Sequence, residues 1–135
     1  MIRKFLVPLL LVFTLACQEQ SKEEALLKTL QAKYRWFGEV SALRISHIER
    51  IKAKTYIAKV EFKLRFRESY ETLRRKVETL FEGKELPKSP GPFIKALMLK
   101  DLRNWCGSFG KGSVCKLELE VILRKVRDSW AVDVI

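Results

Sequence analysis

Histidine, cysteine and glycine are scarce in this chain of 135 residues, and their scarcity narrows the chemistry open to the protein. His47 is the only histidine and no Cys-x-x-Cys pair is present, which falls short of the usual ligand sets for zinc. No Gly-x-Ser-x-Gly nucleophile accompanies His47 as a general base. Gly107, Gly110 and Gly112 lie between two cysteines and form no phosphate-cradling loop. The sequence therefore predicts neither metal nor cofactor, and a protein that is not an enzyme.

Long apolar runs are also missing. The run from Phe5 to Ala16 has twelve residues, whereas a transmembrane helix needs about 20. Arg3 and Lys4 precede this run and Cys17 follows it, which is the layout of a cleaved export signal. The segment Thr14-Leu-Ala-Cys17 resembles the lipobox of bacterial lipoproteins, although leucine is usual in the family where Thr14 stands.

This resemblance implies that residues 1–16 are a signal peptide and that Cys17 becomes an acylated N-terminus. Two or three acyl chains anchor a protein stably, where one chain is marginal. Gln18 stands where the enterobacterial pattern places aspartate for inner-membrane retention, so the implied location is the outer membrane, facing the periplasm. Residues 17–22 would be a lipidated tether and residues 23–135 a single domain. An ordinary secretory signal and an uncleaved N-terminal anchor are the alternatives.

Acidic residues are fewer than basic ones. Residues 17–135 hold 25 of the 27 lysines and arginines and all 16 acids, because only Arg3 and Lys4 are charged in the signal, so their net charge is +9. A basic domain favours anionic neighbours such as lipopolysaccharide phosphates, phospholipid headgroups or an acidic protein face. Export disfavours nucleic acid as a partner. Solubility alone is the alternative, since lysine and glutamate are mixed along the chain.

Cys106 and Cys115 remain as an even pair in an oxidising compartment once Cys17 carries lipid. The segment between them contains three glycines and is flexible enough to bring the sulfur atoms together. Redox-active pairs are normally closer in sequence. We therefore predict a structural disulfide, whose closed loop stabilises the fold by roughly 2.5–3 kcal/mol.

Hydrophobic periodicity predicts the element order α-β-β-α-α-β-β. The expected helices cover 22–37, 69–81 and 93–105, and the expected strands cover 40–51, 56–67, 116–123 and 130–134. Gly38 and Gly83 should end the first two helices, and a change of phase predicts a bulge near His47. We expect an α+β fold with an antiparallel four-stranded sheet and helices packed on one face. Trp36, Trp105 and Trp130 are expected in the core.

The segment from Leu117 to Ile135, a strand, a charged turn and a Trp-x-Val ending, resembles the closing hairpin of the nuclear-transport-factor-like (cystatin-like) α+β superfamily. The segment from Ile45 to Phe66 is similar to the central hairpin of that superfamily. The resemblance implies a small exported lipoprotein without catalytic residues. The chain departs from the pattern by having one helix before the first strand and two helices between the strand pairs.

The second strand carries the candidate binding residues. Its even positions are apolar, while Lys59, Lys63, Arg65 and Arg67 form a basic ridge on its wet face that could contact phosphates. A solvated face crossed by glutamates is the alternative. Glu118 and Glu120 could form a carboxylate pair, although cross-strand pairing with lysine and arginine is the simpler interpretation.

Two functional hypotheses follow from these patterns. The first is a non-enzymatic lipoprotein, anchored at the outer membrane, that binds a protein partner or an anionic envelope component. The second is a carrier of a small apolar ligand, held between the sheet and the helix at 93–105. The oligomeric state and the identity of the partner are not specified by any pattern in the chain.

Lipidation of Cys17 can be tested by mass spectrometry of the protein extracted from its own membranes. We expect the mass of residues 17–135 plus acyl chains, less two hydrogens for the disulfide. A bare chain that retains residues 1–16 would contradict the lipobox interpretation and the export on which it depends.

Overall fold

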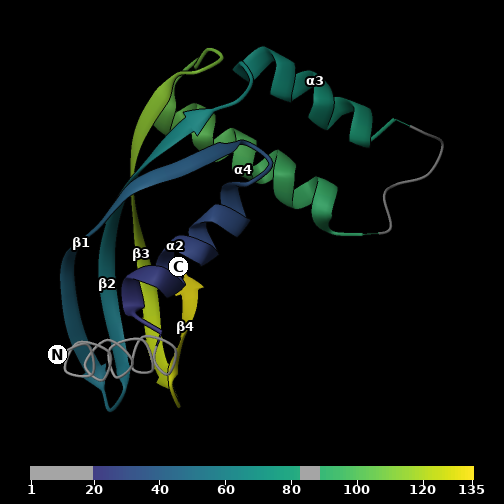
Figure 1. Cartoon of the computed structure of the whole chain (residues 1–135). Coiled ribbons are helices and arrows are strands. Elements are labelled where there is room, and N and C mark those ends of the chain that lie inside the picture. Colours follow the sequence, from purple (N-terminus) through teal and green to yellow (C-terminus); the bar gives the residue numbers. More distant parts are fainter. Residues whose placement is uncertain (1–19, 83–88) are drawn as a thin grey trace, which may run out of the picture. The chain divides into compact units, whose positions relative to one another are not determined.

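The computed structural model describes residues 20–82 and 89–135, and over these ranges the chain forms three helices and four strands. The helices are α2 (Lys22–Tyr34), α3 (Tyr70–Leu80) and α4 (Gly91–Cys106), and the strands are β1 (Gly38–Lys52), β2 (Thr55–Phe66), β3 (Val114–Val126) and β4 (Ser129–Val134). The strands form one open antiparallel sheet in the order β1-β2-β3-β4 (Figure 1). The predicted α+β class and element order are confirmed.

Some predictions fall on other parts of the chain. The signal segment 1–16, the lipidation site Cys17 and the helix stop Gly83 lie outside the described residues. Within the described ranges, no helix combines the length and the apolar character needed to cross a membrane.

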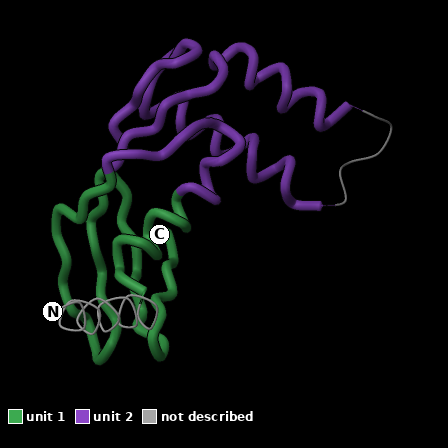
Figure 2. Tube along the Cα trace, in the orientation of Figure 1, with its two compact units in different colours: residues 1–30, 43–61, 118–135 green, residues 31–42, 62–117 purple. Residues whose placement is uncertain are grey.

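The described residues group into two compact units (Figure 2). Unit 1 comprises residues 20–30, 43–61 and 118–135, and unit 2 comprises residues 31–42, 62–82 and 89–117. Helix α2 and strands β1, β2 and β3 each contribute residues to both units, whereas β4 belongs to unit 1 and α3 and α4 belong to unit 2.

The core of unit 1 lies between α2 and the sheet. Leu26 and Leu30 of α2 are fully buried, as are Val60 of β2 and Val121 of β3. The start of the helix is fixed by its cap, since the backbone N–H of Glu24 donates to Ser21 Oγ at 3.1 Å. A second bond joins the chain before α2 to the β3–β4 turn, where Gln20 N–H donates to the carbonyl oxygen of Asp128 at 3.1 Å.

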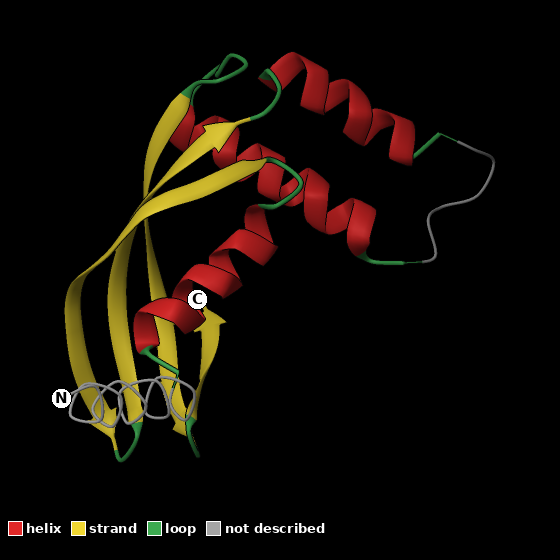
Figure 3. Ribbon diagram, in the orientation of Figure 1, coloured by secondary structure: helices red, strands yellow, loops and turns green. Residues whose placement is uncertain are grey.

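The core of unit 2 is rich in aromatic side chains. Phe62, Leu64 and Phe66 alternate along β2 with exposed charged residues, so the predicted two-residue period of this strand is confirmed. Helices α3 and α4 lie beside each other (Figure 3), and the rings of Phe81 and Phe93 meet edge to face with centroids 5.1 Å apart.

The disulfide between Cys106 and Cys115 is present and closes the glycine-rich loop between α4 and β3. Phe109 in this loop is buried and stacks on Phe66, with ring centroids 3.5 Å apart. The loop is also bonded to the chain around it, because Tyr70 N–H donates to the Phe109 carbonyl at 3.0 Å. The disulfide therefore restrains a loop that packs on the end of β2.

The irregularity of β1 lies at Ala42 rather than near His47. Ala42 has a φ of 54°, and the buried positions change phase from Gly38 and Val40 to the half-buried Leu43 and Ile45. A residue in the left-handed region that shifts the side-chain alternation is the mark of a β-bulge. The apolar residues after His47 that suggested a bulge there do not mark a buried face, since Ile48 is exposed.

Helix α4 does not bury Trp105, so the prediction that this tryptophan lies in the core is wrong. Leu99 and Leu102 are its buried residues, whereas Ile94, Leu97 and Trp105 are exposed. Apolar side chains surround this helix, so periodicity alone does not identify the side that packs. The two other tryptophans, Trp36 and Trp130, are half-buried rather than in the core.

Gly38 is required for a different reason from the one that the sequence suggests. Helix α2 ends at Tyr34, and Gly38 is the first residue of β1, with a φ outside the left-handed region. A Cβ atom at position 38 would lie 2.1 Å from the carbonyl oxygen of Arg65 and 2.8 Å from its carbonyl carbon. Both are backbone atoms, so the contact cannot be relieved by a side-chain rotation.

We expect Gly38→Ala to lower the free energy of unfolding by about 2–3 kcal/mol, because β1 and β2 must separate to admit the methyl group. Urea denaturation measures this change. Gly91→Ala is the matched control, since the nearest atom to its added Cβ is Ser89 Oγ at 3.8 Å. Equal stability of the two variants would show that the close approach at Gly38 does not constrain the fold.

Candidate functional site

A turn at residues 35–37 connects α2 to β1 and is held against the end of β2. Phe37 N–H donates to the Tyr34 carbonyl at 2.9 Å, which closes the turn, and Arg67 N–H donates to the Phe37 carbonyl at 3.2 Å. Gly38 permits this arrangement because it lets the first residue of β1 approach the backbone of β2. The chain just beyond β2 is thereby placed beside the C-terminal end of α2.

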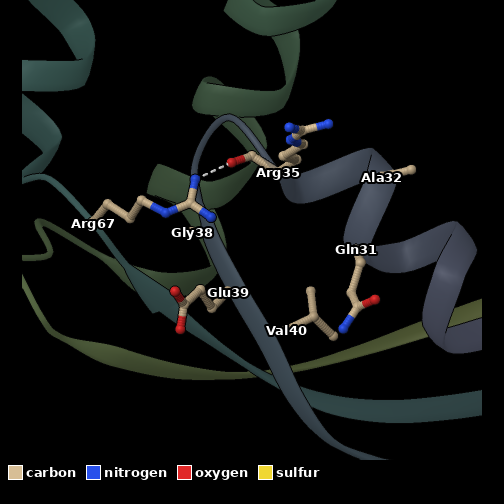
Figure 4. A pocket seen from close by; sticks show the side chains of 7 residues that line it. All are labelled: Gln31, Ala32, Arg35, Gly38, Glu39, Val40 and Arg67. Atoms are coloured by element: carbon tan, nitrogen blue, oxygen red, sulfur yellow. Dashed lines mark hydrogen bonds between the residues drawn. The ribbon is translucent and has the colours of Figure 1, made fainter.

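The side chain of Arg67 is fixed at this corner. Its guanidinium group donates to the carbonyl oxygen of Arg35, just beyond the last residue of α2 (Figure 4). Carbonyl groups at a helix C-terminus have no partner within the helix and carry partial negative charge, so a cation there is favourable. Arg67 thus has a structural role, and its guanidinium nitrogen atoms lie at a fixed place on the surface.

Two cavities adjoin at the corner, and both lie within unit 2. One has a volume of about 460 Å³ and is lined by Gln31, Ala32, Arg35, Gly38, Glu39, Val40 and Arg67. The other has a volume of about 530 Å³ and is lined by Ala32, Arg35, Trp36, Arg67, Glu68, Lys76 and Lys95. Ala32, Arg35 and Arg67 belong to both walls, so the cavities share a border. Volumes of roughly 300–1,000 Å³ are typical of ligand pockets.

Four cations converge on these walls from four separate parts of the chain. Arg35 follows α2, Arg67 follows β2, Lys76 lies on α3 and Lys95 lies on α4. We refer to these four residues as the corner site. Like charges are brought together here by the fold, at a place where an anion would relieve their mutual repulsion.

The carboxylates at the cavities are fewer than the cations. Glu39 lines the first cavity and Glu68 the second, so the walls keep an excess of positive charge. Lys95 lies over the indole ring of Trp36, with its Nζ 5.3 Å from the ring centroid. This cation–π contact holds the ammonium group near the second cavity. The geometry suits the binding of an anion of two or more charges.

The predicted basic ridge contributes one residue to this site. Lys59, Lys63, Arg65 and Arg67 are all exposed, as the strand period indicates. Arg67 alone among them lines the described cavities, while Lys59 lies in unit 1. The other members of the corner site were missed by the sequence analysis. The one sequence feature that could have indicated another member of the site is Arg35, a basic residue at the end of the first predicted helix.

The residues considered for catalysis have ordinary surroundings. His47 Nε2 lies 4.0 Å from the carboxylate of Glu49, and both side chains are exposed. Glu118 and Glu120 are exposed on β3. No cluster of three or more potential metal ligands occurs among the residues that the structure describes.

Comparison of the chain with known protein families, with curated proteins and with solved structures gave no match.

Tyr34, which ends α2 beside the corner site, links stability to alkaline pH. Burial raises its pKa from 10.0 to about 12, and the negative charge of Asp101 adds to the rise. Because the folded-state pKa lies above that of the unfolded chain, the contribution is complete below pH 10 and is lost as the pH rises toward about 12.

We therefore expect the free energy of unfolding to fall by roughly 2–3 kcal/mol across this alkaline range. Tyr34→Phe should remove most of the fall, and Tyr56→Phe on β2 is the control that should retain it. Urea denaturation at several pH values between about 10 and 12 measures the slope. A slope that is identical in the Tyr34→Phe variant would disprove the assignment.

Proposed function

We propose that this protein is a lipid-anchored component of the bacterial envelope that binds a phosphate-bearing anion without catalysing a reaction. The binding surface is the corner site, and the anchor is the acylated Cys17 that the lipobox resemblance implies. Disulfide formation between Cys106 and Cys115 agrees with export to an oxidising compartment.

The observation that carries the binding proposal is the convergence of Arg35, Arg67, Lys76 and Lys95 on adjoining cavities. An arginine guanidinium can bind two phosphate oxygens at once, and lysine supplies a mobile point charge. The bond from Arg67 to the Arg35 carbonyl restricts one guanidinium before any ligand arrives. Such preorganisation lowers the entropy cost of binding.

The carrier hypothesis receives less support. An apolar ligand needs walls that are mostly hydrophobic. The walls of both described cavities contain charged side chains, and Lys95 is their one contribution from α4. The apolar residues of β2 that face the core are already buried by other side chains. They therefore offer no apolar surface to a ligand.

The binding proposal can be tested with inorganic pyrophosphate, which carries charges far enough apart to reach two cations. We expect Lys76→Gln combined with Lys95→Gln to weaken pyrophosphate binding about tenfold, since each lost contact removes a fraction of a kcal/mol to about 1 kcal/mol. Isothermal titration calorimetry measures the affinity. Added salt should weaken binding to the unaltered protein and affect the double variant less.

The matched control is Lys59→Gln combined with Lys63→Gln, which removes the same charge from β2 away from the cavities. Arg67 is left unchanged because its substitution would also remove the cap of α2. Equal affinities of the two double variants would contradict the corner site. Binding of an acidic protein in place of pyrophosphate would favour the partner-protein form of the hypothesis.

A further inference from the structure

The turns of the two hairpins lie at one end of the sheet, within unit 1 (Figure 3). Residues 53 and 54 join β1 to β2, and residues 127 and 128 join β3 to β4. The two hairpin ends are bonded to each other, because Lys125 N–H donates to the carbonyl oxygen of Lys54 at 2.8 Å. We refer to five exposed residues at these ends as the tip surface, namely Ile51, Lys52, Lys54, Val126 and Arg127.

The chain enters the described structure at this same end. Gln20 N–H donates to the carbonyl oxygen of Asp128 at 3.1 Å, so residue 20 is held at the β3–β4 turn. Cys17 precedes Gln20 by three residues, whose extended length is at most about 11 Å. An acylated Cys17 at the level of the lipid headgroups would therefore bring the β3–β4 turn to within about that distance of the bilayer.

Positive charge exceeds negative charge around the two turns. The residues within three positions of each turn, 50–57 and 124–131, hold six cations and one acid, namely Arg50, Lys52, Lys54, Arg124, Lys125 and Arg127 against Asp128. The first turn of α2 adds Lys22, Glu23 and Glu24, and Asp133 is paired with Arg124 at 2.9 Å. Seven cations therefore stand against four acids. Two of those acids lie at the N-terminus of a helix, where the helix dipole offsets part of their charge.

The tip surface has two features that a purely solvated turn does not need. Ile51 and Val126 are large apolar residues that are 54% and 50% exposed. Lys54 and Arg127 have φ values of 59° and 58°, in the left-handed region that favours glycine or asparagine. Each turn thus holds a cation in a strained backbone conformation, with an exposed apolar side chain within three residues of it. Strain of this kind is concentrated at functional sites.

We propose that the tip surface contacts the headgroup region of an anionic phospholipid bilayer. The proposal rests on the anchor of the proposed function, which selects the bilayer as the occupant rather than an acidic protein or a second copy of the chain. Lysine and arginine are attracted to anionic headgroups over about 8 Å at physiological salt, a distance comparable with the reach of the tether. Ile51 and Val126 add apolar side chains that can enter the membrane interface beside these cations. The contact fixes which end of unit 1 faces the membrane.

The test compares two tryptophan probes on the same hairpin of the full chain. The natural tryptophans are first removed by Trp36→Phe, Trp105→Phe and Trp130→Phe. Val126→Trp then places a single probe at the tip surface. Ile135→Trp is the matched probe, because its backbone is bonded to Glu120, which lies about 20 Å from Val126 along β3. Both positions are exposed, at 50% and 67%.

The protein is reconstituted into vesicles of phosphatidylglycerol and phosphatidylcholine whose acyl chains carry bromine, which quenches tryptophan at short range. We expect the Val126→Trp probe to be quenched at least about fivefold more than the Ile135→Trp probe, because only the first lies at the membrane surface. Added salt, or vesicles of phosphatidylcholine alone, should reduce this difference severalfold, and neither comparison requires a further substitution.

Charge reversal at the tip surface tests the role of the cations. Lys52→Glu combined with Arg127→Glu should reduce the quenching of the Val126→Trp probe severalfold. Lys59→Glu combined with Lys63→Glu on β2 is the matched control with the same change of charge. All four side chains are exposed, so both double variants should keep the urea midpoint of the parent. None of them lines the described cavities, so pyrophosphate affinity should also be kept, and the tip surface and the corner site can fail independently.

Equal quenching of the two probes would overturn the proposal, as would quenching that neither phosphatidylglycerol nor charge reversal at the tip surface affects. So would a dimer in sedimentation that is lost on that charge reversal, since it would identify a second copy as the occupant. A bare Cys17 in the mass spectrum would contradict the anchor instead. Selective quenching of the Val126→Trp probe in anionic vesicles would still establish the contact in that case.

Discussion

The approach of Gly38 to the backbone of Arg65 is the constraint on which the arrangement of unit 2 depends. Because no side chain separates them, the start of β1 lies directly against the end of β2. The turn before Gly38 can then accept a hydrogen bond from Arg67 N–H, and the Arg67 side chain can reach the carbonyl of Arg35. The absence of a side chain at Gly38 thus allows Arg35 and Arg67, which are far apart in sequence, to lie next to each other.

The remaining parts of the corner site depend on contacts made beyond that point. Phe109 stacks on Phe66, and the backbone of Tyr70 at the start of α3 is bonded to the carbonyl of Phe109. These contacts fix where α3 begins, and therefore where Lys76 lies. The disulfide restrains the same loop, so a covalent bond supports the position of a residue on another element. The charges themselves contribute little to the stability of this arrangement, since Arg35, Arg67 and Lys76 are exposed and Lys95 is only half-buried.

Sequence patterns were informative where one physical rule decides the structure. The strict alternation in β2 is a local pattern, and the pairing of Cys106 with Cys115 was expected because the lipobox resemblance assigns Cys17 to lipid and leaves two cysteines. The patterns failed on α4, where two sides of the helix are equally apolar. They also failed at Gly38, whose role depends on contact with Arg65, a residue distant in sequence. The corner site resembles Gly38 in this respect, because its four cations come from four elements. Arg67 alone was identified, and it was placed in a ridge with residues that do not line the cavities.

The order of strands in the sheet follows the order of the chain, so the long path between β2 and β3 is an insertion into a simple meander. The insertion leaves and returns at one place. Phe66 N–H donates to the Ser113 carbonyl at 2.9 Å, and Gly112 N–H donates to the Phe66 carbonyl at 2.8 Å. Because both backbone groups of Phe66 are bonded to the returning chain, a change within the loop between α3 and α4 need not displace the end of β2 from the start of β3.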